Sequence, residues 1–243
     1  MITKIDHLVL NIDEKYQTIS EYINEIKRST IPYLPNKGKR NRGFRASNLW
    51  IGKEYFEMIS ILNQDGGGWI EDWVEAYHQN QRGLICLMLS VDDIDKISKN
   101  LARFRVSEPA RISYTFLKLF TLRSPWQNSY LPFFENEMVQ IGFQQVDSQK
   151  VQDRMEKRMK PNSNEHGINS IQEIQMHGNW TTNDFEMLSM VFENHNIGED
   201  YFSAILNSNQ KIEFIVNKTT RTVVKTSSSK KILTTIENVE IHT

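Results

Sequence analysis

The chain has 243 residues, with 29 Lys+Arg against 30 Asp+Glu and a formal net charge of -1. This near-neutral charge argues against a protein that binds nucleic acid through bulk electrostatics. No apolar run approaches the ~18 residues of a membrane span, and the first residues lack the apolar region of a secretory signal. The single cysteine, Cys86, excludes an intramolecular disulfide and a multi-cysteine metal site. Composition therefore predicts a cytoplasmic globular protein whose partners include neither nucleic acid nor membrane.

The first 63 residues carry the pattern of a β-α-β-β-β unit. Residues 5–12 form an apolar, β-branched run that predicts a buried strand. Asp13 follows at the position of a helix N-cap, where its carboxylate can accept a backbone N–H. Two further strand-like runs lie within residues 48–61. Between them and the first strand, apolar residues recur at helical spacing: Tyr16, Ile19, Ile23 and Ile26.

The same pattern returns in the second part of the chain. Residues 87–92 repeat residues 8–13 at an offset of 79 (87 minus 8), with an aspartate again at the capping position. We expect strands over 112–122 and 130–134 to follow. A helix between residues 87–92 and these strands is indicated by a second apolar stripe: Ile94, Ile97, Leu101 and Phe104.

A weaker third copy begins near Ile168 and fills residues 165–243. Residues 171–177 predict a strand, and Thr181 or Thr182 is a candidate cap for a helix that carries Phe185, Leu188 and Phe192. Three later strands are expected, over 212–216, 222–226 and 232–241.

Two connectors separate these units. A glycine-rich break at 65–68 precedes a short amphipathic helix expected over 69–79. The second connector, residues 148–167, is polar and is compatible with helix up to Arg158. We interpret it as the boundary between a paired-module core and an accessory segment.

Paired β-α-β-β-β modules that open with a strand such as Ile5-Asp6-His7-Leu8-Val9-Leu10 resemble the vicinal oxygen chelate superfamily of glyoxalases, extradiol dioxygenases and fosfomycin- and bleomycin-resistance proteins. Within it the chain is most similar to the glyoxalase-like domain family. The resemblance implies an α+β fold in which modules 1–63 and 83–145 form one half-open barrel within residues 1–145. The third segment, 165–243, would pack at its side or extend it. Other residues carry the likeness too: 47–52, 55–59, 82–84, 131–134 and 160–162.

In that superfamily, inward-facing residues on the first and last strands of each module bind one divalent metal. The resemblance assigns His7 and Glu57 to this role, with Glu135 as the candidate from the second module. Imidazole and carboxylate donors suit Zn, Fe, Mn or Ni. At the repeat offset, however, His7 aligns with Cys86, which we expect to be a small core residue. A site without metal is therefore the alternative.

Substrate-binding candidates surround the same cavity. The basic stretch 37–45, which ends at Arg45, is either a loop that attracts an anionic substrate or a solvated connection into the next strand. Asn48, Trp50 and Phe134 are candidates to line the cavity, although aromatic side chains more often pack in a core.

Two functional classes follow from the sequence. The first is a metal-dependent lyase, isomerase or dioxygenase that acts on a small oxygen-rich molecule. The second is a metal-free protein that binds or sequesters such a molecule, as resistance-type members of the superfamily do. The sequence leaves open whether the chain is an enzyme and whether it forms a homodimer.

Overall fold

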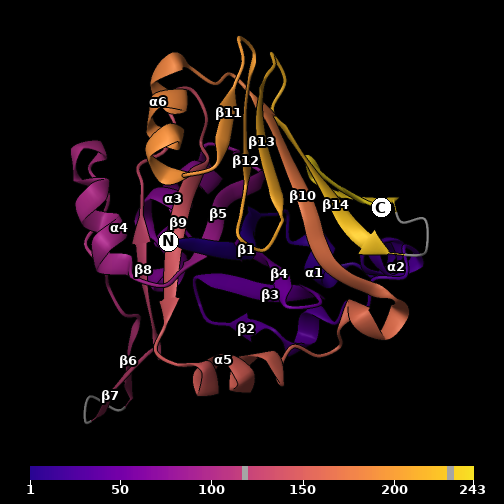
Figure 1. Cartoon of the computed structure of the whole chain (residues 1–243). Coiled ribbons are helices and arrows are strands. Elements are labelled where there is room, and N and C mark those ends of the chain that lie inside the picture. The colour runs from indigo at the N-terminus through magenta and orange to yellow at the C-terminus, as the bar shows by residue number, and fades with distance from the viewer. Residues whose placement is uncertain (117–119, 229–232) are drawn as a thin grey trace.

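The structure of the protein is a computed structural model that describes residues 1–116, 120–228 and 233–243. These residues form two seven-stranded sheets and one separate hairpin (Figure 1). The first sheet is built from the N-terminal two thirds of the chain and the second from the C-terminal third. No helix among them is long and apolar enough to cross a membrane.

The first sheet contains two copies of the same strand pattern, in the order β2-β3-β4-β1-β5-β9-β8. In each copy the first strand lies parallel to the last: β1 pairs with β4, and β5 pairs with β9. The copies join where β1 runs antiparallel to β5. This confirms the α+β fold with paired modules. The strands are β1 Ile2–Asn11, β2 Lys39–Arg40, β3 Phe44–Ile51, β4 Glu54–Ile61, β5 Gly83–Val91, β8 Trp126–Tyr130 and β9 Gln140–Val146.

The helices of this half differ from expectation mainly at their ends. They are α1 Lys15–Thr18, α2 Ser20–Arg28, α3 Glu71–His78 and α4 Ile94–Asn100, with short 3-10 turns at Pro35–Lys37, Gly66–Gly68 and Ala102–Phe104. The expected first helix is broken at Ile19, whose backbone is extended (φ -97°, ψ 120°). The side chain of Asp13 accepts the N–H of Lys15 as predicted, but the N-cap of α1 is Glu14 rather than Asp13. In the second module Asp93, rather than the preceding aspartate, caps α4.

Two strand predictions in the second module were wrong. The run 112–122 is not one strand, because β6 Ser113–Phe116 and β7 Phe120–Arg123 pair as a hairpin; residues 117–119 lie outside the described residues. In the run 130–134 only Tyr130 belongs to a strand, as the last residue of β8, and residues 131–134 form a loop in which Leu131 and Phe134 are buried. The last strand of the module is β9, further along the chain. There polar or small residues at 140, 142 and 144 alternate with apolar ones at 141 and 143.

The second sheet repeats this plan, in the order β11-β12-β13-β10-β14-β16-β15. β10 is parallel to β13, β14 is parallel to β16, and β10 and β14 are antiparallel. The strands are β10 Ile168–Gly178, β11 His195–Ile197, β12 Tyr201–Ile205, β13 Lys211–Val216, β14 Arg221–Ser228, β15 Leu233–Ile236 and β16 Val239–His242. The C-terminal segment therefore contains the related third module and a shorter partner for it, whose described residues, 221–228 and 233–243, include no helix.

The expected elements of this segment are largely present. α6 spans Thr182–Val191, and Thr181 caps it in a capping box with Asp184. The run 232–241 is two strands rather than one, because the chain turns at Glu237, which has a positive φ of 55°. Ile232 lies outside the described residues.

The two sheets share one hydrophobic core. A single cluster contains Leu8 and Phe56 of the first sheet together with Phe214 and Val224 of the second. We call the faces that meet in this cluster the core faces. Gln210 links them, because its Oε1 accepts the N–H of Ile5 at 2.8 Å and its Nε2 donates to a β10 carbonyl at 2.8 Å.

Glu54 is a second polar link between the sheets. Its side chain lies in the core region and accepts the N–H of Ile171 at 3.1 Å. Burial raises the pKa of Glu54 to about 7, although the Ile171 N–H and the charge of Lys4 oppose the shift. This carboxyl group therefore titrates near neutral pH between the two sheets.

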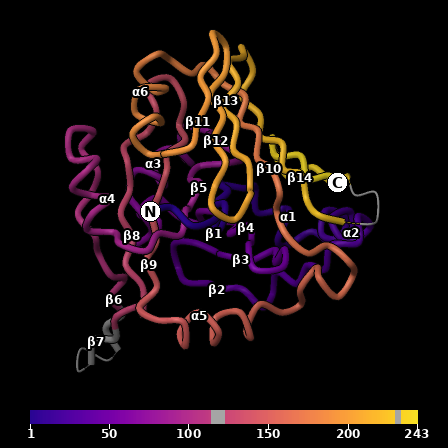
Figure 2. Tube along the Cα trace, viewed as in Figure 1, coloured from indigo at the N-terminus to yellow at the C-terminus, as the bar shows by residue number. Residues whose placement is uncertain are grey.

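The connection between the sheets runs past the end of β3. It carries α5 Gln149–Glu156 and a 3-10 turn at Ser163–His166, and Figure 2 traces its path from β9 to β10. The side chain of Asn162 accepts the N–H of Gly52 at 3.0 Å and donates to its carbonyl at 2.7 Å. This pair of bonds fastens the connection to the β3–β4 turn.

Candidate functional site

The face of the first sheet opposite its core face, here called the site face, has an apolar half and a polar half. In the apolar half, α3 packs Trp73 and Val74 against Val9 and Ile59. The indole N–H of Trp73 donates to the side chain of Gln140 at 2.7 Å. The helix that links the two modules thus fills this half of the face.

The polar half is organised by His7 and Asp6. The register between β1 and β5 shifts between Ile5 and His7, a β-bulge that brings neighbouring side chains to one side of the strand. His7 Nδ1 lies 2.7 Å from Asp6 Oδ1, and the imidazole stacks on the ring of Tyr55 at a centroid distance of 4.4 Å. These contacts fix the orientation of the imidazole.

Asp6 is held in turn by two further donors. Ser90 Oγ donates to it at 2.7 Å and Gln144 Nε2 at 3.0 Å. Burial alone raises the pKa of Asp6, but the hydrogen bond and charge of His7, helped by Ser90, bring it below the usual value. Asp6 is therefore an ionised acceptor for the Nδ1–H of His7, which leaves Nε2 to face outward.

Nε2 of His7 faces Glu57. The distance from Nε2 to Glu57 Oε2 is 3.9 Å, too long for a direct hydrogen bond, and a quarter of the Glu57 side chain is exposed. Burial raises the pKa of Glu57, and the charges of His7 and Lys39 oppose this effect. Asn48 lies directly opposite Glu57 on β3. One ligand oxygen at hydrogen-bonding distance from both groups could bridge the gap between them.

The second module does not supply the remaining donors of a metal centre. Leu8 pairs with Phe56 as Leu87 pairs with Ile141, so the residue that corresponds to Glu57 is Gly142. A Cβ at this glycine would overlap the sulfur of Met88.

The position that corresponds to His7 holds Cys86, which is fully buried, and burial raises the pKa of its thiol well above the usual value. Over residues 1–116, 120–228 and 233–243, no three His, Cys, Asp or Glu side chains are grouped to hold a metal ion. These residues do not fit the metal centre that the resemblance implies.

The other site candidates fall into two groups. Asn48 and Trp50 lie on the site face, where the Trp50 ring is 4.6 Å from that of Tyr55. Arg45 lies on the opposite side of β3 and pairs with Glu14 at 3.0 Å.

Two candidates from the second module also lie elsewhere. Phe134 is buried between Trp180 and Phe214, in the core shared by the sheets. Glu135 accepts the hydroxyl of Thr181 at the start of α6, at 2.8 Å. Neither residue lies beside His7, because the loop that carries them leaves the first sheet after β8.

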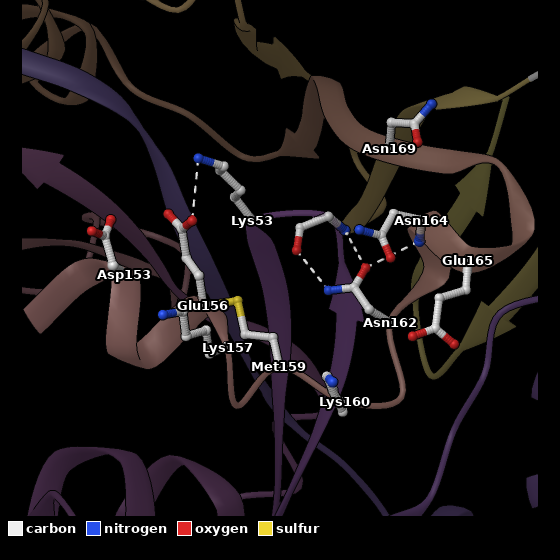
Figure 3. A pocket seen from close by; sticks show the side chains of 11 residues that line it. Lys53, Asp153, Glu156, Lys157, Met159, Lys160, Asn162, Asn164, Glu165 and Asn169 are labelled. Carbon is white, nitrogen blue, oxygen red and sulfur yellow. Dashed lines mark hydrogen bonds and ion pairs between the residues drawn. The ribbon is translucent and has the colours of Figure 1, made fainter. Parts of the chain in front are cut away.

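Two cavities lie where the connection passes β3 and β4. One of about 290 Å³ opens beside Asn48 and Trp50. The other, of about 600 Å³, lies at the Gly52–Lys53 turn (Figure 3). Lys53 pairs with Glu156 across this second cavity at 3.2 Å, and Asn162 holds Gly52 at its other end. The smaller cavity shares Asn48 and Trp50 with the site face, and a third cavity of about 310 Å³ is lined by Ser90 and Gln144, the two donors to Asp6.

Comparison with known proteins identifies the fold. No protein-family model and no curated protein matches the chain. Among solved structures, a hypothetical protein from Staphylococcus aureus is similar over 100% of this chain and 98% of its own, with a TM-score of 0.71 and 15% identity.

Two similar structures have named activities. One is a xylose isomerase-like TIM barrel/4-hydroxyphenylpyruvate dioxygenase fusion protein, with a TM-score of 0.57 and 10% identity. The match covers 93% of this chain and 36% of the fusion protein. The other is a mutant of 4-hydroxymandelate synthase from Streptomyces coelicolor, with a TM-score of 0.51 and 8% identity. The match covers 88% of this chain and 63% of the synthase. The chain therefore shares the fold of these structures, which is the glyoxalase-like fold that the sequence predicts.

Proposed function

We propose that this chain is a metal-free binding protein for a small oxygen-rich molecule, which it holds on the polar half of the site face. The observation that carries the proposal is the asymmetry between the modules. The first contributes His7 and Glu57, whereas the second contributes Cys86 and Gly142, neither of which offers an accessible donor. A metal ion would have only two protein ligands here, fewer than the three that open metal sites use.

The polar groups suit hydrogen bonding to a ligand better than metal binding. With Asp6 accepting the Nδ1–H, the neutral form of His7 presents Nε2 as an acceptor. Glu57, whose pKa is raised by burial, holds a proton over a wider pH range than a free glutamate. A ligand hydroxyl can therefore donate to Nε2, and the Glu57 carboxyl group can hydrogen bond to the same ligand. Asn48 adds an amide beside them.

Ligand binding can be tested with a panel of small hydroxy and keto compounds, including catechol and glycerol, by thermal-shift screening followed by titration calorimetry. We expect His7→Ala and Glu57→Gln to weaken binding of a hit about tenfold each, which is about 1.4 kcal/mol. His166→Ala is the matched control, because His166 is exposed on the turn before β10. Equal effects of His7→Ala and His166→Ala would refute the proposed site.

A metal-dependent enzyme is the second candidate, and one distance favours it. Metal bonds to imidazole nitrogen and carboxylate oxygen are about 2.0–2.2 Å each, so the separation of 3.9 Å between His7 Nε2 and Glu57 Oε2 permits both to bind one ion. Stoichiometric Zn, Fe, Mn or Ni that is lost in His7→Ala would establish this alternative.

A further inference from the structure

The cavity beside Trp50 has an unusual balance of charge. Its lining contains three cationic side chains and no carboxylate: Leu34, Lys37, Gly38, Asn48, Trp50, Arg158, Lys160 and Pro161. The chain as a whole is nearly neutral, with a net charge of -1. A cavity of about 290 Å³ with three cations around an indole ring would attract an anion.

The cations reach this cavity from two distant parts of the sequence, and backbone contacts hold both parts in place. Lys37 ends a 3-10 turn, and a Cβ at the next residue, Gly38, would overlap the carbonyl oxygen of Ala46 on β3. Glycine thus lets the loop lie directly against the strand. On the other side, Arg158 and Lys160 precede Asn162, whose two bonds to Gly52 fasten their segment to the turn that follows β3.

No ion pair within the described residues neutralises these cations. Arg158, Lys160 and Lys37 form none of the ion pairs found there, whereas nearby Glu156 is already paired with Lys53. Lys160 also borders the neighbouring cavity, which contains Asp153, Glu156 and Glu165 (Figure 3). The acidic side chains therefore lie in the neighbouring cavity, whereas the lining beside Trp50 contains no carboxylate.

The cavity borders the polar half of the site face through Asn48 and Trp50. Asn48 lines the cavity and lies opposite Glu57, while Trp50 lines it and contacts Tyr55, which stacks on His7. A single ligand can thus extend from the cations to the His7–Glu57 pair.

We propose that the ligand is an organic oxyanion, whose carboxylate or phosphate group binds Lys37, Arg158 and Lys160 beside the Trp50 ring. This inference rests on the proposed function, because it names the class of molecule bound at that site. The planar guanidinium of Arg158 matches the two oxygens of such a group, and the lysines add point charges. The basic stretch in the sequence contributes Lys37 to this cavity, but not Arg45.

The test uses phenyl phosphate, benzoate and the neutral benzyl alcohol as probes, each titrated calorimetrically into the full chain at low and high salt. We expect saturable binding of at least one anion, weaker at high salt, and at least tenfold weaker binding of benzyl alcohol. Preference between phenyl phosphate and benzoate identifies the anionic group. Arg158→Ala/Lys160→Ala should weaken anion binding at least tenfold. The matched control is Lys157→Ala, which removes an exposed cation that borders only the neighbouring cavity.

Three results would overturn the proposal: no saturable anion binding, equal binding of benzyl alcohol, or equal losses in Lys157→Ala and in the double variant. Failure of the proposed function gives a different result. In that case the double variant loses anion binding while His7→Ala and Glu57→Gln bind every probe and every panel compound as the native chain does.

Discussion

Replacing Glu54 by glutamine should change how stability depends on pH. The carboxyl group has a pKa of about 7 in the folded chain, against 4.5 in an unperturbed glutamate. Because one pKa unit corresponds to about 1.36 kcal/mol, this difference of about 2.5 units costs the folded state about 3 kcal/mol once the group is ionised. Between about pH 4.5 and 7 the folded chain retains a proton that the unfolded chain has released. Its stability therefore falls as pH rises through this window.

Glu54→Gln removes the charge and keeps an oxygen that can accept the N–H of Ile171. Urea unfolding of both proteins at several values between pH 4.5 and 8.5 measures the difference in free energy. We expect the free energy of unfolding of the variant to rise relative to that of the native chain as pH increases, until the variant is more stable by about 3 kcal/mol above pH 7. Glu193→Gln, which alters an exposed glutamate, should show no such trend. A constant difference between Glu54→Gln and the native chain across this range would refute the reasoning.

Three further predictions follow from single contacts. Gln210→Ala should lower the free energy of unfolding by about 2–4 kcal/mol in urea titrations, because the Ile5 N–H and the Ile171 carbonyl lose buried partners; a loss below about 0.5 kcal/mol would contradict the bridging role. Cys86 should not react with Ellman's reagent at pH 8 until the chain unfolds, since its thiol is buried with a raised pKa; rapid reaction of the folded chain would show an accessible thiol. Gly38→Ala should weaken anion binding about as much as loss of one cation, since its Cβ would overlap the backbone of β3. Unchanged binding would show that the position of this loop does not matter for the anion.

The repeat predicted much of the fold because it rests on periodicity. Runs such as 8–13 and 87–92 are buried strands followed by a capped helix, and alternation of faces and helical spacing are local properties that a sequence records directly. The fourth unit, formed by β14, β15 and β16, has a weaker signature in the sequence. β14 and β16 are paired only in three dimensions, and the tight turn at Glu237 lacks the glycine that marks such turns.

The site was only half predictable. The strands of the first module bring His7, Glu57, Asn48 and Trp50 to one face, because these strands are contiguous and in register. The sequence points to Glu135 as the residue of the second module that corresponds to Glu57, whereas that residue is Gly142 on β9. β9 is hard to predict as a strand, because its site face carries polar residues. The alternation of Ile141 and Phe143 with polar or small residues is the sequence pattern that indicates this strand.

Other parts of the site have no local signature. Asp6 reaches His7 because of a β-bulge, and Ser90 and Gln144 reach Asp6 from strands that are neighbours only in the folded sheet. Arg158 and Lys160 approach Trp50 from more than 100 positions away. Such groupings depend on tertiary packing, which the spacing of residues along the chain does not reveal.

Metal content of the purified chain tests the central claim most directly. The protein is incubated with Zn, Fe, Mn or Ni, passed through a desalting column and measured by plasma mass spectrometry, beside His7→Ala and Glu57→Gln. We expect far less than one ion per chain, with no difference between the native chain and either variant, because the second module places Cys86 and Gly142 where donors would be needed. One tightly held ion per chain that disappears in both variants would contradict this account.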